Sequence, residues 1–195
     1  ITRHDDVRAV LPDTERFVNS RAASTRGSRI SPKILALYEE KGWVPAPTLA
    51  GRDDPEHREM RALFNHAFRP KRIAELEPKI GALADELIDG FIDAGTCEWV
   101  RQFAVPLPLV IIGVQMGANP DDIWRIKAWT DAWVQRLGLM QTSEQVVWST
   151  EMEIEAQHYF QPIFERLRAT PDDTLLSDLV NTPIPEWGRC LTDEE

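Results

Sequence analysis

The stretch DDPEHREMR, residues 53–61, sets a histidine and an arginine four residues apart near the start of a predicted helix. At about 100° of rotation per residue, four side chains fall along one side of that helix: His57, Arg61, Phe64 and Phe68. An anionic ligand with a flat, apolar body would suit two cations beside two aromatic rings, because arginine binds a carboxylate through two parallel hydrogen bonds. These four residues are therefore a candidate ligand-binding stripe, although a histidine and an arginine four residues apart are by themselves a weak pattern.

The two cations differ in their local partners. A positive charge in the first turns of a helix is unfavourable, because the free N–H groups and the helix dipole already make that end positive. Asp54 lies three residues before His57, whereas no acidic residue lies three or four positions from Arg61. Two alternatives remain open: Arg61 binds an anionic ligand, or it pairs with an acid of another segment while His57 merely flanks the core.

Helical signals dominate the elements that must position this stripe. Asp54 is expected to cap its helix, with Pro55 at the first helical position. The buried face of that helix is expected to consist of Met60, Leu63, Phe64, Ala67 and Phe68. Caps, prolines, glycines and apolar spacing predict helices over 4–11, 32–42, 55–68, 70–95, 107–116, 120–137, 143–169 and 173–180. The run 107–116 is apolar nearly all round, which is typical of a helix buried on several sides. A short strand is expected at 97–100, and the fold class is mainly α.

Composition restricts the function. With 195 residues, 43% hydrophobic and 28% charged, the chain fits one globular domain or part of one. A net charge of −10 argues against nucleic-acid binding. The longest apolar run is broken by Pro106 and Pro108 and is far shorter than the roughly 20 residues of a membrane span, so we expect a soluble, cytoplasmic protein. Cys97 and Cys190 lack a CxxC pattern, which indicates reduced thiols rather than a disulfide framework or a structural metal site.

Both ends of the sequence indicate an internal stretch of a longer chain. It opens on Ile1 without an initiator methionine or a signal-peptide pattern. At the other end, Thr192 and Glu195 have the spacing of a capping box, which predicts that a helix starts there.

The order of several segments resembles the front-to-middle part of a bacterial cytochrome P450. The resemblance is carried by ITRHDDVRAVL, DDPEHREMRALFNHAFRPKRIAELEPKIGALADELID, FAVPLPLVIIGVQMG, DDTLLSDLV and LTDEE. It implies a mainly α, multi-helix fold with a minor β region, of which residues 1–195 would form part of a single haem-binding domain, incomplete at both ends. In that family the His and Arg of H-x-x-x-R bind the propionates of haem b, which carries over to His57 and Arg61, with Phe64 and Phe68 beside the apolar macrocycle.

The same resemblance implies a haem-dependent monooxygenase. Such enzymes oxidise a small hydrophobic substrate with O₂ and electrons from a redox partner, here expected to be a ferredoxin-type donor. The family's iron-ligating cysteine loop and its oxygen-activating acid/alcohol pair are absent from this sequence, so no catalytic or metal-ligating residue is expected within it. Neither Cys97 nor Cys190 has the context of the iron ligand.

The walls of the substrate pocket are expected, by resemblance, from residues 21–49 and 129–148. The candidate side chains are Trp133, Leu137, Leu139 and Met140, and plain helix packing is the alternative for each. A different class of function, a non-catalytic helical domain that binds a hydrophobic ligand or a partner protein, also stays open. A terpene cyclase ranks lower, because the acid cluster at 53–56 has no second metal-binding motif beside it.

Overall fold

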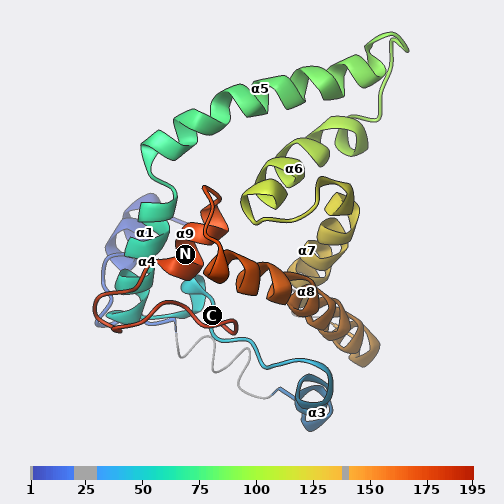
Figure 1. Cartoon of the computed structure of the whole chain (residues 1–195). Coiled ribbons are helices and arrows are strands. Elements are labelled where there is room, and N and C mark those ends of the chain that lie inside the picture. The colour runs from blue at the N-terminus through green and yellow to red at the C-terminus, as the bar shows by residue number, and fades with distance from the viewer. Residues whose placement is uncertain (1, 20–29, 138–140) are drawn as a thin grey trace.

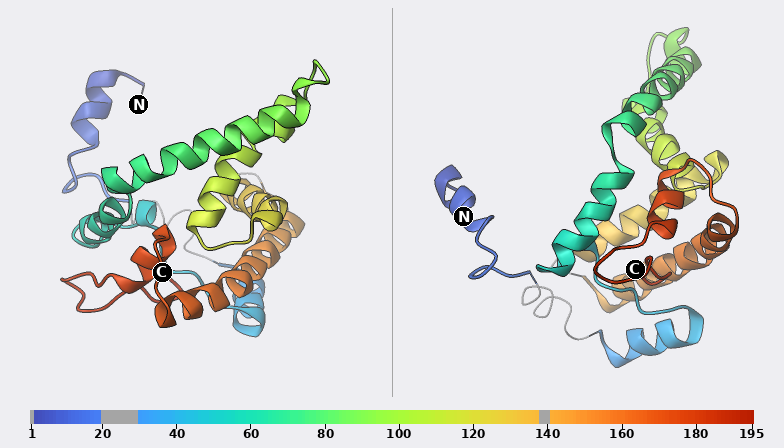
Figure 2. Two further views of the ribbon diagram at one scale, coloured as in Figure 1. Left: turned by 45° about the horizontal axis from the view of Figure 1, so that its top comes forward. Right: turned by 60° about the vertical axis from the view of Figure 1, so that its left-hand side comes forward.

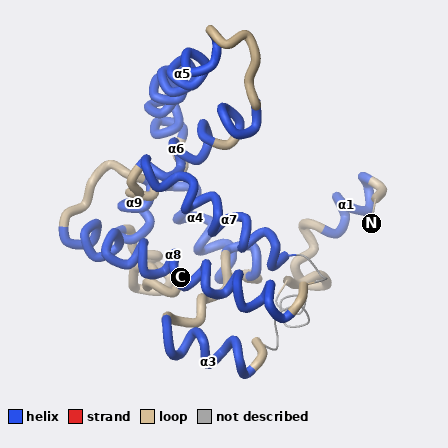
Figure 3. The backbone as a smooth tube through the Cα atoms, turned by 90° about the vertical axis from the view of Figure 1, so that its right-hand side faces the viewer, coloured by secondary structure: helices blue, strands red, loops and turns tan. Residues whose placement is uncertain are grey.

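The computed structural model describes residues 2–19, 30–137 and 141–195, together with the backbone but not the side chain of Leu137. Helices and loops make up these residues (Figure 3), and their extended pairing is limited to one antiparallel bridge between Ile184 and Arg189. The expected mainly α fold is therefore confirmed. No helix in the described ranges combines the length and the apolar character that crossing a bilayer requires.

The helices follow one another as α1 (His4–Val10), α3 (Pro32–Lys41), α4 (Glu56–Ala67), α5 (Pro70–Ile92), α6 (Pro106–Gln115), α7 (Ile123–Leu137), α8 (Ser143–Ala169) and α9 (Leu175–Asn181). Short 3-10 or π turns also occur, at η1 (Leu49–Gly51), η2 (Val100–Ala104) and η3 (Pro120–Asp122).

The long helix α8 is the centre of the arrangement. It packs against α3, α7 and α9, while α6 contacts both α7 and α5 (Figure 1). Helix α5 reaches away from α8 along α6, as the two views of Figure 2 show. Helix α4 packs on α9, so the helix that carries the predicted ligand stripe rests on the C-terminal third of the chain.

The main core cluster fixes α4. It joins the predicted buried face of α4 to α9 and to the segment after it, through Met60, Leu63, Ala67, Leu175, Leu179, Ile184 and Leu191. Fully burying a leucine- or methionine-sized side chain contributes about 1.5–3 kcal/mol. The apolar spacing in the sequence therefore orients α4 correctly, with its other sides left for polar contacts. The prediction for the last member of this face, Phe68, is wrong: it follows the final helical residue, leaves the helical rotation and is exposed.

Local capping agrees with the sequence at several helix starts. Ser31 Oγ accepts a hydrogen bond from the Ile34 N–H at 3.4 Å, and Asn119 Oδ1 accepts one from the Asp121 N–H at 3.1 Å. Thr142 and Gln145 form a reciprocal capping box that starts α8 at the predicted residue. Each of these caps satisfies backbone donors that the helix itself leaves free.

Two local predictions are wrong. Asp54 does not cap α4: the helix begins at Glu56 with Pro55 in the cap position, and the Asp54 carboxylate faces His57 instead. Residues 97–100 form no strand. The Glu98 carboxylate accepts hydrogen bonds from the backbone N–H groups of Val100 (3.3 Å) and Arg101 (2.6 Å), which stabilises a helical turn leading into η2.

Helix α6 is less enclosed than its composition predicts. Only Pro106, Gly113 and Gln115 are buried in it, whereas Ile112 and Val114 are each 39% exposed. Its apolar side chains instead border two cavities, one toward α7 and α8 and one toward α5. Apolar composition alone therefore overstated the burial of this helix within the chain.

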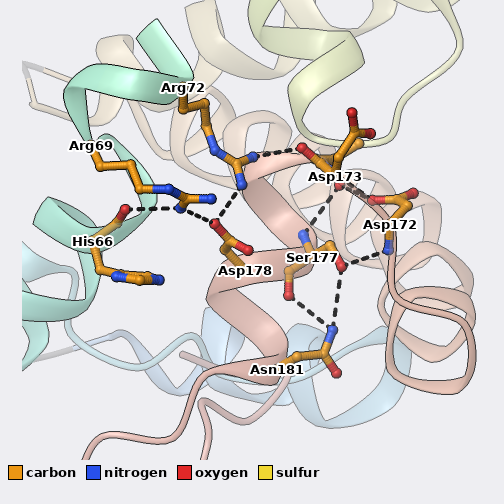
Figure 4. A network of polar contacts seen from close by, with 9 residues as sticks. His66, Arg69, Arg72, Asp172, Asp173, Ser177, Asp178 and Asn181 are labelled. Carbon is orange, nitrogen blue, oxygen red and sulfur yellow. Dashed lines mark hydrogen bonds and ion pairs between the residues drawn. The ribbon is translucent and has the colours of Figure 1, made fainter. Parts of the chain in front are cut away.

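A buried ion pair fastens the start of α5 to α9 (Figure 4). The Arg72 side chain is 7% exposed; its Nη2 lies 2.5 Å from Asp178 Oδ2 and its Nη1 donates to the Asp173 carbonyl at 2.8 Å. Arg69 donates to the same carboxylate oxygen at 2.7 Å from a more exposed position. Because α5 follows α4 after two residues, this network also fixes the C-terminal end of α4.

Candidate functional site

Helix α4 separates its charges onto two flanks. Its buried face lies in the middle, with Glu59 on one side, the acidic flank, and His57 and Arg61 on the other, as a rotation of about 100° per residue requires. Glu56 lies in the first turn, above the buried face. The acids are committed to the protein: Glu56 pairs with Arg52 at 3.0 Å, and Glu59 accepts a hydrogen bond from Trp187 Nε1 at 2.7 Å. Neither is used to neutralise the cationic flank.

His57 has the local acid that its spacing predicts. Its Nδ1 lies 3.6 Å from Asp54 Oδ1, and the imidazole is 40% exposed. The ring also borders a cavity of about 240 Å³ formed by α4, the segment before it and the loop that follows α1. His57 is therefore held near one carboxylate while part of its ring stays open.

Arg61 is exposed and has only a neutral side-chain partner. Its Nε donates to Asn65 Oδ1 at 3.3 Å. Every Asp and Glu of the chain belongs to the described residues, and none of those carboxylates lies within 4.0 Å of this guanidinium. The alternative of an ordinary ion pair with another segment is therefore not found here, and within the described residues the Arg61 side chain donates to Asn65 alone.

The two aromatic residues of the stripe differ in exposure. Phe64 is half-buried and packs against the core cluster beneath α4. Phe68 follows the last helical residue, is 46% exposed, and borders the cavity of about 350 Å³ between α5 and α6. The exposed stripe thus runs from His57 through Arg61 to Phe68, with Phe64 beneath it.

The expected substrate walls are only partly covered by the structure. Trp133 is 49% exposed and borders a cavity of about 370 Å³ between α6, α7 and α8. Leu137 ends α7 with its side chain undescribed, and Leu139 and Met140 lie outside the described residues. Of the four candidates, the structure thus places one beside a cavity.

One polar cluster in that cavity was missed by sequence reasoning. Arg136 and Glu153 line it, and the Glu153 carboxylate accepts hydrogen bonds from both Arg136 and the fully buried Tyr38. Arg136 also donates to the Tyr38 hydroxyl at 2.9 Å. The three residues come from α3, α7 and α8 and are far apart in sequence, so no local pattern could have indicated their contact.

The cysteines and acids of the described residues offer no evident metal centre. Both cysteines are free thiols, Cys97 on the surface and Cys190 partly covered. Within the described ranges, no group of three or more His, Cys, Asp or Glu side chains is arranged to hold a metal ion.

The cationic stripe fits a cofactor that carries carboxylates on a flat apolar body. An exposed guanidinium without an acidic partner, a partly open imidazole and an exposed phenylalanine ring lie on one flank of α4. Charge-assisted pairs of arginine with carboxylate are among the stronger hydrogen bonds in proteins, and they gain geometry when both oxygens are engaged.

Comparison with known proteins gives this stripe a context. No protein-family model matches the chain. Among curated proteins, Cytochrome P450(MEG) of Priestia megaterium is 32% identical over 200 residues, which cover all of this chain and 46% of that protein. Steroid C26-monooxygenase of Mycobacterium tuberculosis is 32% identical over 149 residues, covering 76% of this chain and 40% of its own length.

A solved structure gives the same result for the fold. Cytochrome P450 CYP109Q5 from Chondromyces apiculatus superposes with a TM-score of 0.72 at 29% identity, covering 98% of this chain and 44% of that one. The chain spans less than half of the length of the relatives that it matches. These similarities imply a haem cofactor. In sequence and in fold alike, the chain belongs to the bacterial cytochrome P450s.

Proposed function

We propose that this chain is part of a single haem-binding domain of a monooxygenase, and that α4 holds the haem carboxylates through His57 and Arg61. The observation that carries the proposal is Arg61: an exposed guanidinium with a neutral amide as its only side-chain partner among the described residues. Phe68 would lie beside the apolar macrocycle, and Phe64 would support the stripe from below.

The complete enzyme would oxidise a small hydrophobic molecule with O₂ and electrons from a ferredoxin-type donor. When bound, haem supplies the oxygen-activating chemistry, with an iron-ligating cysteine expected outside residues 1–195. The residues of this chain would bind the haem carboxylates, orient the macrocycle and keep water away from an apolar substrate. A curated relative is named for oxidation of a steroid, which supports a hydrophobic substrate without specifying it.

The cavity between α6, α7 and α8 supports a contribution to substrate binding. Its walls are almost entirely apolar, and Trp133 lies in them as the resemblance implies. Arg136 and Glu153 add one polar end, and they are already paired with each other and with Tyr38. We therefore expect this region to select for an apolar body, because transfer of apolar surface out of water is the main driving force in such a cavity.

The test of haem binding compares His57→Ala/Arg61→Ala with wild type in the complete domain. Arg58→Ala is the matched control, because Arg58 is an exposed cation on the same helix, outside the stripe. Haem transfer to apomyoglobin is followed by absorbance. Loss of two charge-assisted partners, together about 2–3 kcal/mol, should accelerate haem loss by roughly 30- to 150-fold, with little change in the control.

Two results would overturn the proposal. Equal rates of haem loss in the double variant and in Arg58→Ala would remove His57 and Arg61 from the site. Failure of the complete domain to incorporate haem, or to give a thiolate-shifted Soret band after reduction with carbon monoxide, would favour the alternative of a non-catalytic binding domain.

A further inference from the structure

The loop after α9 is fastened to the acidic flank of α4. Trp187 Nε1 donates to Glu59 Oε2 at 2.7 Å. Two guanidinium groups also lie over its indole ring: the Cζ atoms of Arg52 and Arg189 are 5.5 Å and 5.2 Å from the ring centroid. Cation–π contacts of this kind are worth about 0.5–1 kcal/mol at exposed sites and more when they are shielded from water.

The same guanidinium groups connect this loop to the segment before α4. Arg52 is 9% exposed; it pairs with Glu56 at 3.0 Å and Glu195 at 3.4 Å, and its Nε donates to the Pro47 carbonyl at 3.0 Å. Arg189 Nη1 lies 2.5 Å from Glu195 Oε2. The acidic flank of α4, the segment that enters it and residues 187–195 therefore form one continuous polar network.

This network opposes rotation of α4 about its own axis. The core holds Met60 and Leu63 by apolar contacts, which are non-directional, whereas the Glu59–Trp187 hydrogen bond has a preferred distance and angle. With side chains, a helix has a radius of about 5–6 Å, so a rotation of roughly 20° moves a group at that radius by about 2 Å. A shift of that size is enough to break a hydrogen bond on the opposite flank.

We propose that Trp187 is a positioning residue for the cofactor carboxylates. Through Glu59 it sets the rotation of α4, and so it directs His57 and Arg61 on the other flank. This inference rests on the proposed function, because it takes the ligand of the cationic flank to be the haem carboxylates. Among the described residues, Trp187 forms no hydrogen bond with His57 or Arg61, so its effect on them would pass through the helix.

A double-mutant cycle on the haem-loaded complete domain tests the proposal. Trp187→Phe keeps an aromatic ring for Arg52 and Arg189 but removes the N–H group that donates a hydrogen bond to Glu59. We expect it to accelerate haem transfer to apomyoglobin by roughly three- to tenfold in the wild-type background. In the His57→Ala/Arg61→Ala background the same substitution should change the rate less than about twofold, because the groups that it positions are gone.

A purely structural role for Trp187 predicts a different pattern. The substitution would then accelerate haem loss by the same factor in both backgrounds, and that additivity would overturn the proposal. Glu59→Ala provides a second arm of the cycle if Trp187→Phe does not fold, with the same non-additivity expected. Trp124→Phe is the matched control: this exposed indole, which contacts Arg101, lies on α7, away from α4, and its replacement should leave the rate unchanged.

The two proposals fail separately. If His57→Ala/Arg61→Ala does not change haem loss, the proposed function is wrong. If that double variant accelerates haem loss while Trp187→Phe does not, the haem site stands and only the positioning role of Trp187 is overturned.

Discussion

Removal of the Asp178 carboxylate should strongly destabilise the protein, because it leaves a buried cation unpaired. Asp178 Oδ2 accepts hydrogen bonds from both Arg69 and Arg72, but only Arg72, at 7% exposure, is cut off from water. Breaking a buried ion pair by deleting one partner costs about 3–5 kcal/mol. The Asp178 side chain is itself 23% exposed, so we expect Asp178→Ala to cost about 3 kcal/mol, near the lower end of that range.

The exposed arginine provides the comparison. Arg69→Ala removes a pair in which the cation is 40% exposed, and such pairs contribute about 0–1 kcal/mol. Replacing Arg72 by Met together with Asp178→Ala removes the unpaired charge, so the double variant should recover most of the lost stability. Urea unfolding of the complete domain, followed by circular dichroism, measures the free energy of unfolding of each of the three variants relative to wild type.

Two results would refute this reasoning. A cost for Asp178→Ala no larger than that for Arg69→Ala would show that burial of Arg72 does not decide the energetics. A double variant less stable than Asp178→Ala alone would show that the packing of Arg72, rather than its charge, is what the protein needs.

Two further predictions concern a glycine and a carboxylate. Gly117→Ala should destabilise the protein by about 1–2 kcal/mol in urea unfolding, because Gly117 has φ +72° and a Cβ there would lie 3.0 Å from Ile163. Gly81 lies in the interior of α5, where an added Cβ would meet nothing within 4 Å, so Gly81→Ala should instead stabilise the protein by about 0.5–1 kcal/mol. A reversed order of these two effects would contradict the steric account. Hydrogen bonding from Arg189 holds the pKa of Glu195 below its ordinary range. As the pH falls, the Glu195 carboxylate is therefore protonated at a lower pH in the folded state than in the unfolded state. The stabilisation should therefore be complete above about pH 4.3, the ordinary glutamate value, and be lost as pH falls below it; Glu195→Gln should flatten this acid limb in urea titrations at several pH values, and an unchanged limb would exclude the carboxylate as its source.

Much of the fold could be predicted because its determinants are local. The apolar spacing in 55–68 predicted five buried residues on α4; the core cluster contains Met60, Leu63 and Ala67, whereas Phe64 is half-buried and Phe68 is exposed. The absence of an acid at the helical neighbours of Arg61 was likewise a local fact, and the structure shows an amide in that place. The helix starts at Pro32 and Ser143 could also be predicted from the sequence, since a cap acts on backbone groups two or three residues away.

The features that could not be predicted depend on partners distant in sequence. Glu59 and Trp187 are 128 residues apart, and Arg72 and Asp178 are 106 apart, so nothing near either residue indicates the contact. The strand expected at 97–100 failed for a different, local reason. A short run of this kind fits a strand or a helical turn equally well, and here the Glu98 carboxylate favours the turn.

The opposed flanks of α4 also change how the overall charge of the protein should be viewed. A net charge of −10 describes a molecule that repels anions at long range, yet fields beyond about 8–10 Å are screened at physiological ionic strength. Within that distance, an approaching dianion would meet the guanidinium of Arg61, while Glu59 faces Trp187 on the opposite flank of the helix and Glu56 is paired with Arg52. Binding of an anionic ligand therefore depends on the charges close to the site, which cannot be inferred from the isoelectric point of 4.9.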